Sequence, residues 1–155
     1  MPPPILKHKQ ALLEIFTAAM EGGQPLFGLC NGVLKSALSK IPAGDNFIVL
    51  GEFSASDVRV GFMQKKFRVV SQDILAISII RDNPEGEETA ETAGFELARG
   101  IRTVLSANKT LISASYPSGI AIESEHSDSK QIFVVIQDLL TCVQWMSLRM
   151  KVIED

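Results

Sequence analysis

Five carboxylates are crowded into the stretch RDNPEGEETAETAG, which covers positions 81–94 and contains Asp82, Glu85, Glu87, Glu88 and Glu91. A calcium loop of the EF-hand type needs oxygen ligands at alternate positions and a glycine at the sixth. Counted from Asp82, the third position is Pro84 and the fifth is Gly86, so this pattern fails. Acid–base catalysis by two carboxylates needs them held apart in a cleft, with one desolvated. These five instead crowd a loop and a helical turn, where water reaches them.

The residues after this stretch explain its acids. An apolar stripe at helical spacing runs through Ala90, Ala93, Leu97, Ile101 and Val104. Carboxylates at the N-terminus of a helix interact favourably with its dipole, by about 0.3–1 kcal/mol each. We therefore predict a long amphipathic helix over about residues 87–107, with the acidic stretch as its exposed start.

The other chemistry-bearing residues do not form a recognisable site. In the segment ESEHSD, strand alternation places Glu123 and Glu125 on one face and His126 on the other, so a shared metal ion is not expected. The two cysteines, Cys30 and Cys142, form no CxxC motif, and we predict that both are reduced and buried. The glycines near residue 30 lack the GK[ST] ending of a phosphate-binding loop. We predict no catalytic residue, cofactor or metal, and hence no enzyme.

The composition sets broad limits. A chain of 155 residues has the length of one domain, and we treat residues 1–155 as such. The net charge of -3 gives no basic excess for nucleic-acid recognition. The longest aliphatic and aromatic run, IFVVI at positions 132–136, is too short to span a bilayer, so no membrane association is expected.

The expected elements follow from periodicity and turn residues. The segment QALLEIFTAAM predicts an N-terminal helix, Asn31 is placed to cap a short helix through Leu38, and strands are expected at DNFIVLGEF and around residues 74–80. Residues 54–66 read as a mobile loop that contains a short strand near 58–62. The segments GIAIESEHS and QIFVVIQDLLTCVQW predict a hairpin with a turn at DSK. Trp145 is assigned to the core by default, and the alternative is an anchor residue if its strand lies at an edge of the sheet. Residues 1–5 and 147–155 are expected to be flexible ends.

This order of elements predicts an α+β fold. The sheet is expected to be mainly antiparallel, because strands follow one another as meanders with few helices between them. The long helix at about 87–107 and the N-terminal helix are expected to pack on one face.

The same order resembles a known family. It consists of ALLEIFTAAM, the turn-rich PLFGLCNGVL, the proline-led strand IPAGDNFIVLGEF, the strand DILAISIIRD with a loop containing Gly86, the helix AETAGFELARGIRTVLSANKTL, and AIESEHSDSKQIFVVIQDLLTCV. In this layout, from about residue 10 to 143, the chain resembles the tail-terminator (tail-completion, head-to-tail joining) proteins of long-tailed bacteriophages.

The resemblance implies an assembly role without chemistry. It implies that six copies of the chain form a ring that caps the tail tube, stops tube elongation and offers the surface to which the head joins. The implied partners are further copies of the chain, the tail tube protein and a head-completion or connector protein. The implied location is the head-proximal end of the virion tail, after synthesis in the host cytoplasm.

The resemblance also suggests a use for the polar loop. Phe62, Lys65, Lys66 and Arg68 are the expected interaction residues, which would contact a neighbour or the tube; an ordinary flexible loop is the alternative. Two other functions stay open. One is a different phage connector or a tail-tube-type subunit. The other is a small cytosolic α+β enzyme or ligand-binding domain, whose pocket would include Cys30, His126 or the acidic stretch.

Overall fold

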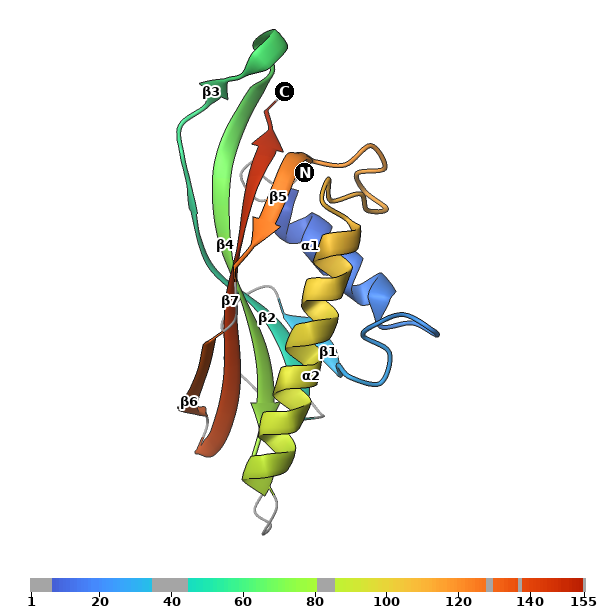
Figure 1. The fold of residues 1–155 in the computed structure, drawn as a ribbon, viewed down its shortest axis with the longest axis vertical. Coiled ribbons are helices and arrows are strands. Elements are labelled where there is room, and N and C mark those ends of the chain that lie inside the picture. Colours follow the sequence, from blue (N-terminus) through green and yellow to red (C-terminus); the bar gives the residue numbers. More distant parts are fainter. Residues whose placement is uncertain (1–6, 35–44, 81–85, 128–129, 137, 155) are drawn as a thin grey trace.

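Two long antiparallel strands form the centre of the sheet and give the molecule its elongated shape (Figure 1). They are β4 (Lys66–Ile79) and β7 (Leu139–Ile153), and they pair without interruption from Phe67↔Ile153 to Ile79↔Thr141. The computed structural model describes residues 7–34, 45–80, 86–127, 130–136 and 138–154. None of the helices in these residues is long and apolar enough to cross a membrane.

The remaining strands flank this pair. The sheet order is β1-β2-β4-β7-β5, with β3 added to β4 and β6 added to β7. The other elements are α1 (Lys7–Ala19), β1 (Gly32–Leu34), β2 (Asn46–Ala55), β3 (Arg59–Val60), a 3-10 turn η2 (Phe62–Gln64), α2 (Gly86–Ala107), β5 (Ala121–His126) and β6 (Lys130–Ile136).

The predicted fold class requires correction. Strand β1 pairs with β2 in parallel, through Gly32↔Phe47 and Leu34↔Val49, so the sheet is mixed. Among the described residues, strands make up 44% and helices 28%, with two α-helices. The fold is thus a mixed sheet with two helices, and the predicted mainly antiparallel sheet is wrong. Local alternation could not reveal this, because a three-residue strand has too few residues to show a period, and parallel pairing depends on the path of the chain.

The predicted short helix from Asn31 is also wrong in its first turn, since residues 32–34 form β1. The Asn31 side chain instead accepts hydrogen bonds from the backbone N–H groups of Asp45 and Asn46, both at 3.0 Å. Asn31 therefore fixes the start of β2 rather than the start of a helix. The rest of the predicted helix lies outside the described residues.

The predicted hairpin between residues 120 and 145 has a different pairing. Strands β5 and β6 do not pair with each other; both run antiparallel to β7, β5 beside its second half and β6 beside its first half. Between them, the Ser127 N–H donates to the Ser147 carbonyl at 2.9 Å, so the two strands form one interrupted edge. The tight turn lies between Ile136 and Leu139, where Asp138 has a φ of 65°. Asp tolerates this left-handed conformation better than most residues.

Residues 147–153, which we expected at a flexible end, continue β7 in the middle of the sheet. Leu148, Met150 and Val152 on this half of β7 are buried. Residues 1–5 lie outside the described part of the chain. The expected loop at 54–66 contains the end of β2, the short β3 and the turn η2.

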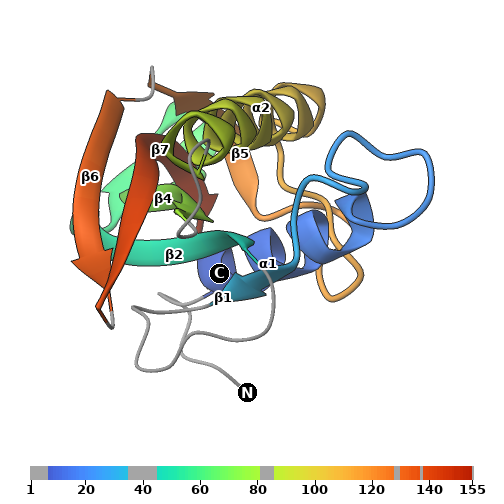
Figure 2. The ribbon, with the colours of Figure 1, turned by 90° about the horizontal axis from the view of Figure 1, so that it is seen from below.

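One face of the sheet is covered by both helices (Figures 1 and 2). Alternate strand residues meet buried residues of α1 and α2 there, and this core includes Leu12, Phe16, Ile48, Leu50, Ile74, Ala76, Leu97, Ile101, Leu105, Met146 and Leu148. We call this the covered face. The residues between them point to the other side, the open face, where, among the described residues, Val49, Ile77 and Val143 form a small buried cluster.

Candidate interaction surfaces

A β-bulge in the middle of β2 shapes the open face. Leu50 pairs with Ile74 and Phe53 pairs with Gln72, so two residues of β2, Gly51 and Glu52, lie opposite one residue of β4. Such a bulge bends its strand and leaves backbone groups without ladder partners. The missing bonds must come from side chains.

Gln72, which is fully buried, supplies them. Its side-chain amide nitrogen donates to the carbonyls of Gly51 and Asp73, both at 2.8 Å. The amide oxygen then lies 2.8 Å from Nε2 of His8 on α1. Because the backbone carbonyls can only accept, the amide orientation is fixed and His8 Nε2 must carry the proton. Helix α1, β4 and the bulge are thus held by one buried polar network.

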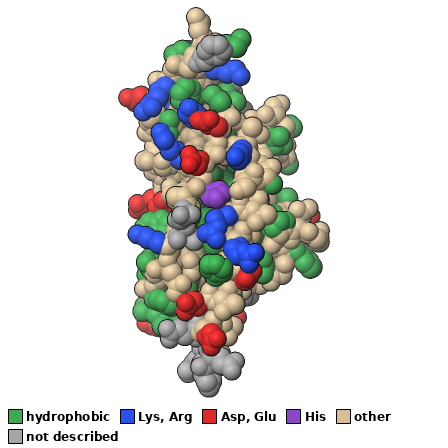
Figure 3. All heavy atoms as spheres, viewed as in Figure 1, with side chains coloured by type: hydrophobic (Ala, Val, Ile, Leu, Met, Phe, Trp, Pro, Cys, Tyr) green, Lys and Arg blue, Asp and Glu red, His purple; other side chains and the backbone are tan. Residues whose placement is uncertain are grey.

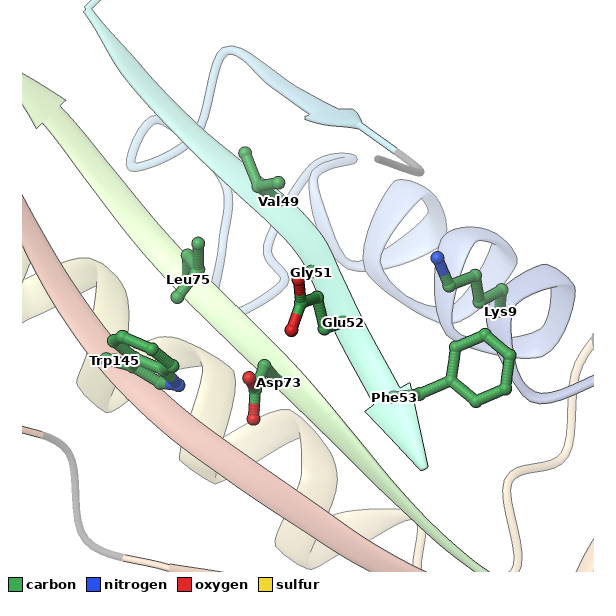
Figure 4. A pocket seen from close by; sticks show the side chains of 8 residues that line it. All are labelled: Lys9, Val49, Gly51, Glu52, Phe53, Asp73, Leu75 and Trp145. Carbon is green, nitrogen blue, oxygen red and sulfur yellow. The ribbon is translucent and has the colours of Figure 1, made fainter. Parts of the chain in front are cut away.

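The bulge borders a groove of about 630 Å³ on the open face. Val49, Leu75 and Trp145 give it an apolar floor and wall, and Gly51 leaves it open (Figure 4). The carboxylates of Glu52, on β2, and Asp73, on β4, also line it (Figure 4). At one end of the groove, Lys9 lies over the ring of Phe53, with its Nζ 5.3 Å from the centroid.

The residues of the groove are suited to bind a side chain that has an apolar stem and a positively charged end. Within the described residues, neither Glu52 nor Asp73 forms an ion pair. Lys130 already lies over the ring of Trp145, with Nζ 5.0 Å from the centroid, which shows that this indole accepts a cation. A lysine or arginine side chain could place its methylenes on the floor and its charge at the two carboxylates.

The hairpin of β3, η2 and β4 projects beyond the rest of the sheet (Figure 1). Met63 and Val60 are 79% and 66% exposed, and basic and hydrophobic side chains lie together at this end of the molecule (Figure 3). Met63 and Gln64 adopt left-handed backbone conformations, with φ of 61° and 59°. Residues other than glycine or asparagine are uncommon there, at a cost of order 1 kcal/mol each. We call residues 59–66 the tip.

The structure separates the expected interaction residues. Lys65 and Lys66 are exposed on the tip. Arg68 lies further along β4, where it donates to the Ser56 carbonyl at 3.1 Å and pairs with Glu154 at 3.3 Å, so its charge is used within the fold. Phe62 lies in η2, and its side chain is outside the described part of the structure. Their role in binding stays a prediction.

The cysteines and histidines considered for chemistry lie apart from one another in the fold. Cys142 is buried as predicted, whereas Cys30 is only partly buried, so that part of the prediction is wrong. Burial raises the pKa of the Cys30 thiol, against the opposing effect of hydrogen bonds with the backbone of Gly32 and Ile48. Burial also raises the pKa of Cys142, so neither thiol is activated as a thiolate. His126 lies 3.0 Å from the Ser106 hydroxyl of α2. No group of three potential metal ligands occurs in the residues that the structure describes.

The acidic stretch is only partly visible. Residues 81–85 lie outside the described part of the chain, and the remainder begins α2 at Gly86. Glu88 and Glu91 are exposed on this helix.

The groove was missed because its parts are far apart in the sequence. Trp145, assigned to the core from its residue type, is only partly buried and lines the groove. The usable signal was the single glycine inside the strand NFIVLGEF, since an isolated glycine in a strand often marks a bulge.

A second apolar surface lies at the free edge of β6. Phe133, Val135 and the neighbouring Leu140 of β7 are 41%, 69% and 41% exposed. Outside β7, β6 has no further strand beside it in the described residues. Open edges of this kind can pair with another chain.

Comparison with known proteins gives a likeness of fold. No protein-family model matches the chain, and no curated protein matches it. Among solved structures, a chain from "Virion of native gene transfer agent (GTA) particle" is similar, with a TM-score of 0.50 and 9% sequence identity. The alignment covers 90% of this chain and 93% of that chain. At this identity the similarity establishes a shared fold.

Proposed function

We propose that this protein is a structural component of a phage-like virion. The observation that carries the proposal is the fold shared with a chain of a gene transfer agent particle, over nearly the full length of both chains. The resemblance in element order to phage tail-terminator proteins leads to the same class of protein from the sequence.

Within that class, we propose a tail-terminator-type role. The subunits form a ring of six that closes the tail tube, prevents further addition of tube subunits and offers a surface to the head connector. Three surfaces formed by the described residues support this: the exposed tip, the groove and the β6 edge. A ring of identical subunits needs two different complementary surfaces on each copy, because its contacts are head to tail.

The proposed role is binding and does not include catalysis. The activity of such a subunit is the occupation of a surface, so the functional residues are those that contact neighbours. The exposed tip and the groove are therefore more relevant to function than Cys30 or His126.

The proposal is tested by the assembly state of the purified protein. We expect size-exclusion chromatography with light scattering to give a closed oligomer, and negative-stain images to show rings, either alone or after addition of tail tubes. Tubes incubated with the protein should stop growing at the capped end.

Other outcomes distinguish the alternatives. Open filaments of this chain alone would indicate a tube-type subunit instead. A protein that stays monomeric with and without tubes and binds a small metabolite would overturn the virion role in favour of a ligand-binding or enzymatic domain.

A further inference from the structure

We propose that the tip of one subunit binds in the groove of a neighbouring copy of the same chain. The tip is residues 59–66. In the groove, Lys9 and Phe53 line one end, and Glu52, Asp73 and the apolar Val49, Leu75 and Trp145 line the rest, beside Gly51. This inference rests on the proposed ring function and identifies the two surfaces that form its subunit contact.

Charge is the first argument. The tip sequence RVGFMQKK contains Arg59, Lys65 and Lys66 and no acidic residue. The groove presents the carboxylates of Glu52 on β2 and Asp73 on β4, and Lys9 lies at its end over Phe53 (Figure 4). A basic surface and an acidic surface on one chain attract each other between copies, and they disfavour tip-to-tip and groove-to-groove contacts.

Shape and polarity are the second argument. The tip carries the most exposed apolar side chain among the large hydrophobic residues described, Met63, together with Val60. The groove floor of Val49, Leu75 and Trp145 is apolar, and its volume of about 630 Å³ suits several side chains. A methionine is well suited to an aromatic-walled site, because its thioether makes favourable contacts with rings.

The tip cannot serve the groove of its own chain. Lys66 and Asp73 are separated by seven residues of one continuous strand, which is about 23 Å at 3.3 Å per residue. The tip is also held in place: the Gly61 N–H donates to the Lys65 carbonyl at 2.8 Å, and β3 pairs with β4 at Val60↔Lys66. A contact between two different surfaces on two copies is head to tail, as a closed ring requires.

The strained backbone of the tip fits this use. Two successive residues in the left-handed region, Met63 and Gln64, persist because the turn around them is fixed. Gly61 at its base allows this turn to pack on the ring of Phe67, since a Cβ there would lie 2.9 Å from a ring carbon. The tip thus presents Met63 in one conformation, which reduces the entropy lost on binding.

Charge reversal tests the contact. One variant reverses the tip by Lys65→Glu with Lys66→Glu, and another reverses the groove by Glu52→Lys with Asp73→Lys. Each alone should raise the concentration needed for assembly about tenfold or more. An equimolar mixture should assemble again as an alternating ring, because each acidic tip then meets a basic groove and each basic tip an acidic groove. Thermal unfolding of each variant checks that its fold is retained.

A cross-link tests proximity without reversing any charge. Met63→Cys on one chain and Gly51→Cys on another should form an intermolecular disulfide under mild oxidation. The Gly51 position tolerates a side chain, because a Cβ there would make an ordinary contact of 3.5 Å with the Asp73 Cβ. All cross-linking variants also carry Cys30→Ser, because Cys30 is only partly buried whereas Cys142 is buried. Two controls should not cross-link: the Cys30→Ser chain alone, and Met63→Cys mixed with Phe95→Cys on the outside of α2.

The outcomes separate this inference from the proposed function. Rings that form normally with both charge-reversed variants, or that give no Met63–Gly51 cross-link above the controls, would overturn the tip-to-groove contact and leave the ring intact. Tip variants that assemble into rings but fail to stop tube growth would reassign the tip to the tube. A wild-type chain that neither assembles nor cross-links would overturn both proposals.

Discussion

The two faces of the sheet differ in what packs against them, although alternate residues of the same strands form both faces. On β4, Ile74 is fully buried beneath the helices, whereas Leu75 lines the groove on the other side. The covered face is completed by α1 and α2 of the same chain. The open face has only a small buried cluster, and in our proposal a neighbouring copy completes it. Substitutions on the covered face should therefore change stability, and substitutions on the open face should change assembly.

The strongest test places a charge in the covered core. Ile101 is fully buried on α2, so Ile101→Asp should destabilise the fold by about 4 kcal/mol or more and leave little folded protein. Circular dichroism during urea unfolding measures this. Phe95→Asp on the same helix is the matched control, because Phe95 is 52% exposed and should lose about 1 kcal/mol or less.

Substituting alanine for two adjacent residues of β4, one on each face, compares how much each face contributes to stability. Ile74→Ala should cost about 2–5 kcal/mol, because it leaves a cavity inside the covered core. Leu75→Ala should cost roughly half as much, since its side chain is partly exposed and water can enter the widened groove. The pair is measured by denaturant unfolding alongside the oligomer size. Equal stability losses, with no effect of Leu75→Ala on assembly, would contradict the division between the faces.

Gln72 connects the two faces, and its loss should have an intermediate effect. Gln72→Leu removes the bonds to the Gly51 and Asp73 carbonyls and to His8, which should cost about 1–3 kcal/mol. A double-mutant cycle with His8→Phe, read from urea midpoints, should give non-additive losses because both residues belong to one network. Additive losses would mean that the bulge is held without α1.

The smallest effect is expected outside both faces. Glu88→Gln changes an exposed residue in the first turns of α2 and should alter stability by about 0.5 kcal/mol or less. Assembly should be unchanged in light scattering. A loss of infectivity or of ring formation in this variant would give the acidic stretch a function that we do not assign to it.

The spacing of apolar residues along the sequence correctly predicts the features of this fold that depend only on residues close together in the chain. Ala90, Leu97 and Ile101, which share one side of a helix at 3.6 residues per turn, are buried on α2. Residues 76–79 of β4 are buried on both sides of the sheet, as their apolar run indicates, whereas Leu75 is only partly buried. These properties require no knowledge of which strands pair.

Pairing partners were not predictable in the same way. The segment 131–145 reads as one apolar strand, yet it folds back at Asp138, where there is no Asn-Gly or Asp-Gly signal. The DSK segment was expected to be the turn of a hairpin, but the strands before and after it both pair with β7 and not with each other; residues 128–129 lie outside the described part of the chain. The groove combines residues of three strands, and its position depends on a bulge that a single glycine marks only weakly. Lys65 and Lys66 were identified as exposed basic residues, but the surface that could receive them was not.

The central position of β7 affects when, during synthesis, a subunit becomes able to bind its neighbour. Of the strands described, β7 is synthesised last, and β4, β5 and β6 all pair with it. During translation β4 therefore has one edge without a partner strand. The pairing of β4 with β7 joins residues far apart in the sequence, and such pairings form slowly. Trp145 arrives with the same strand, so the groove has no aromatic wall before that step. The end of β7 also supports the base of the tip, since Phe67 pairs with Ile153 and the Glu154 N–H donates to the Lys66 carbonyl. A nascent chain therefore lacks both complete surfaces until β7 is in place.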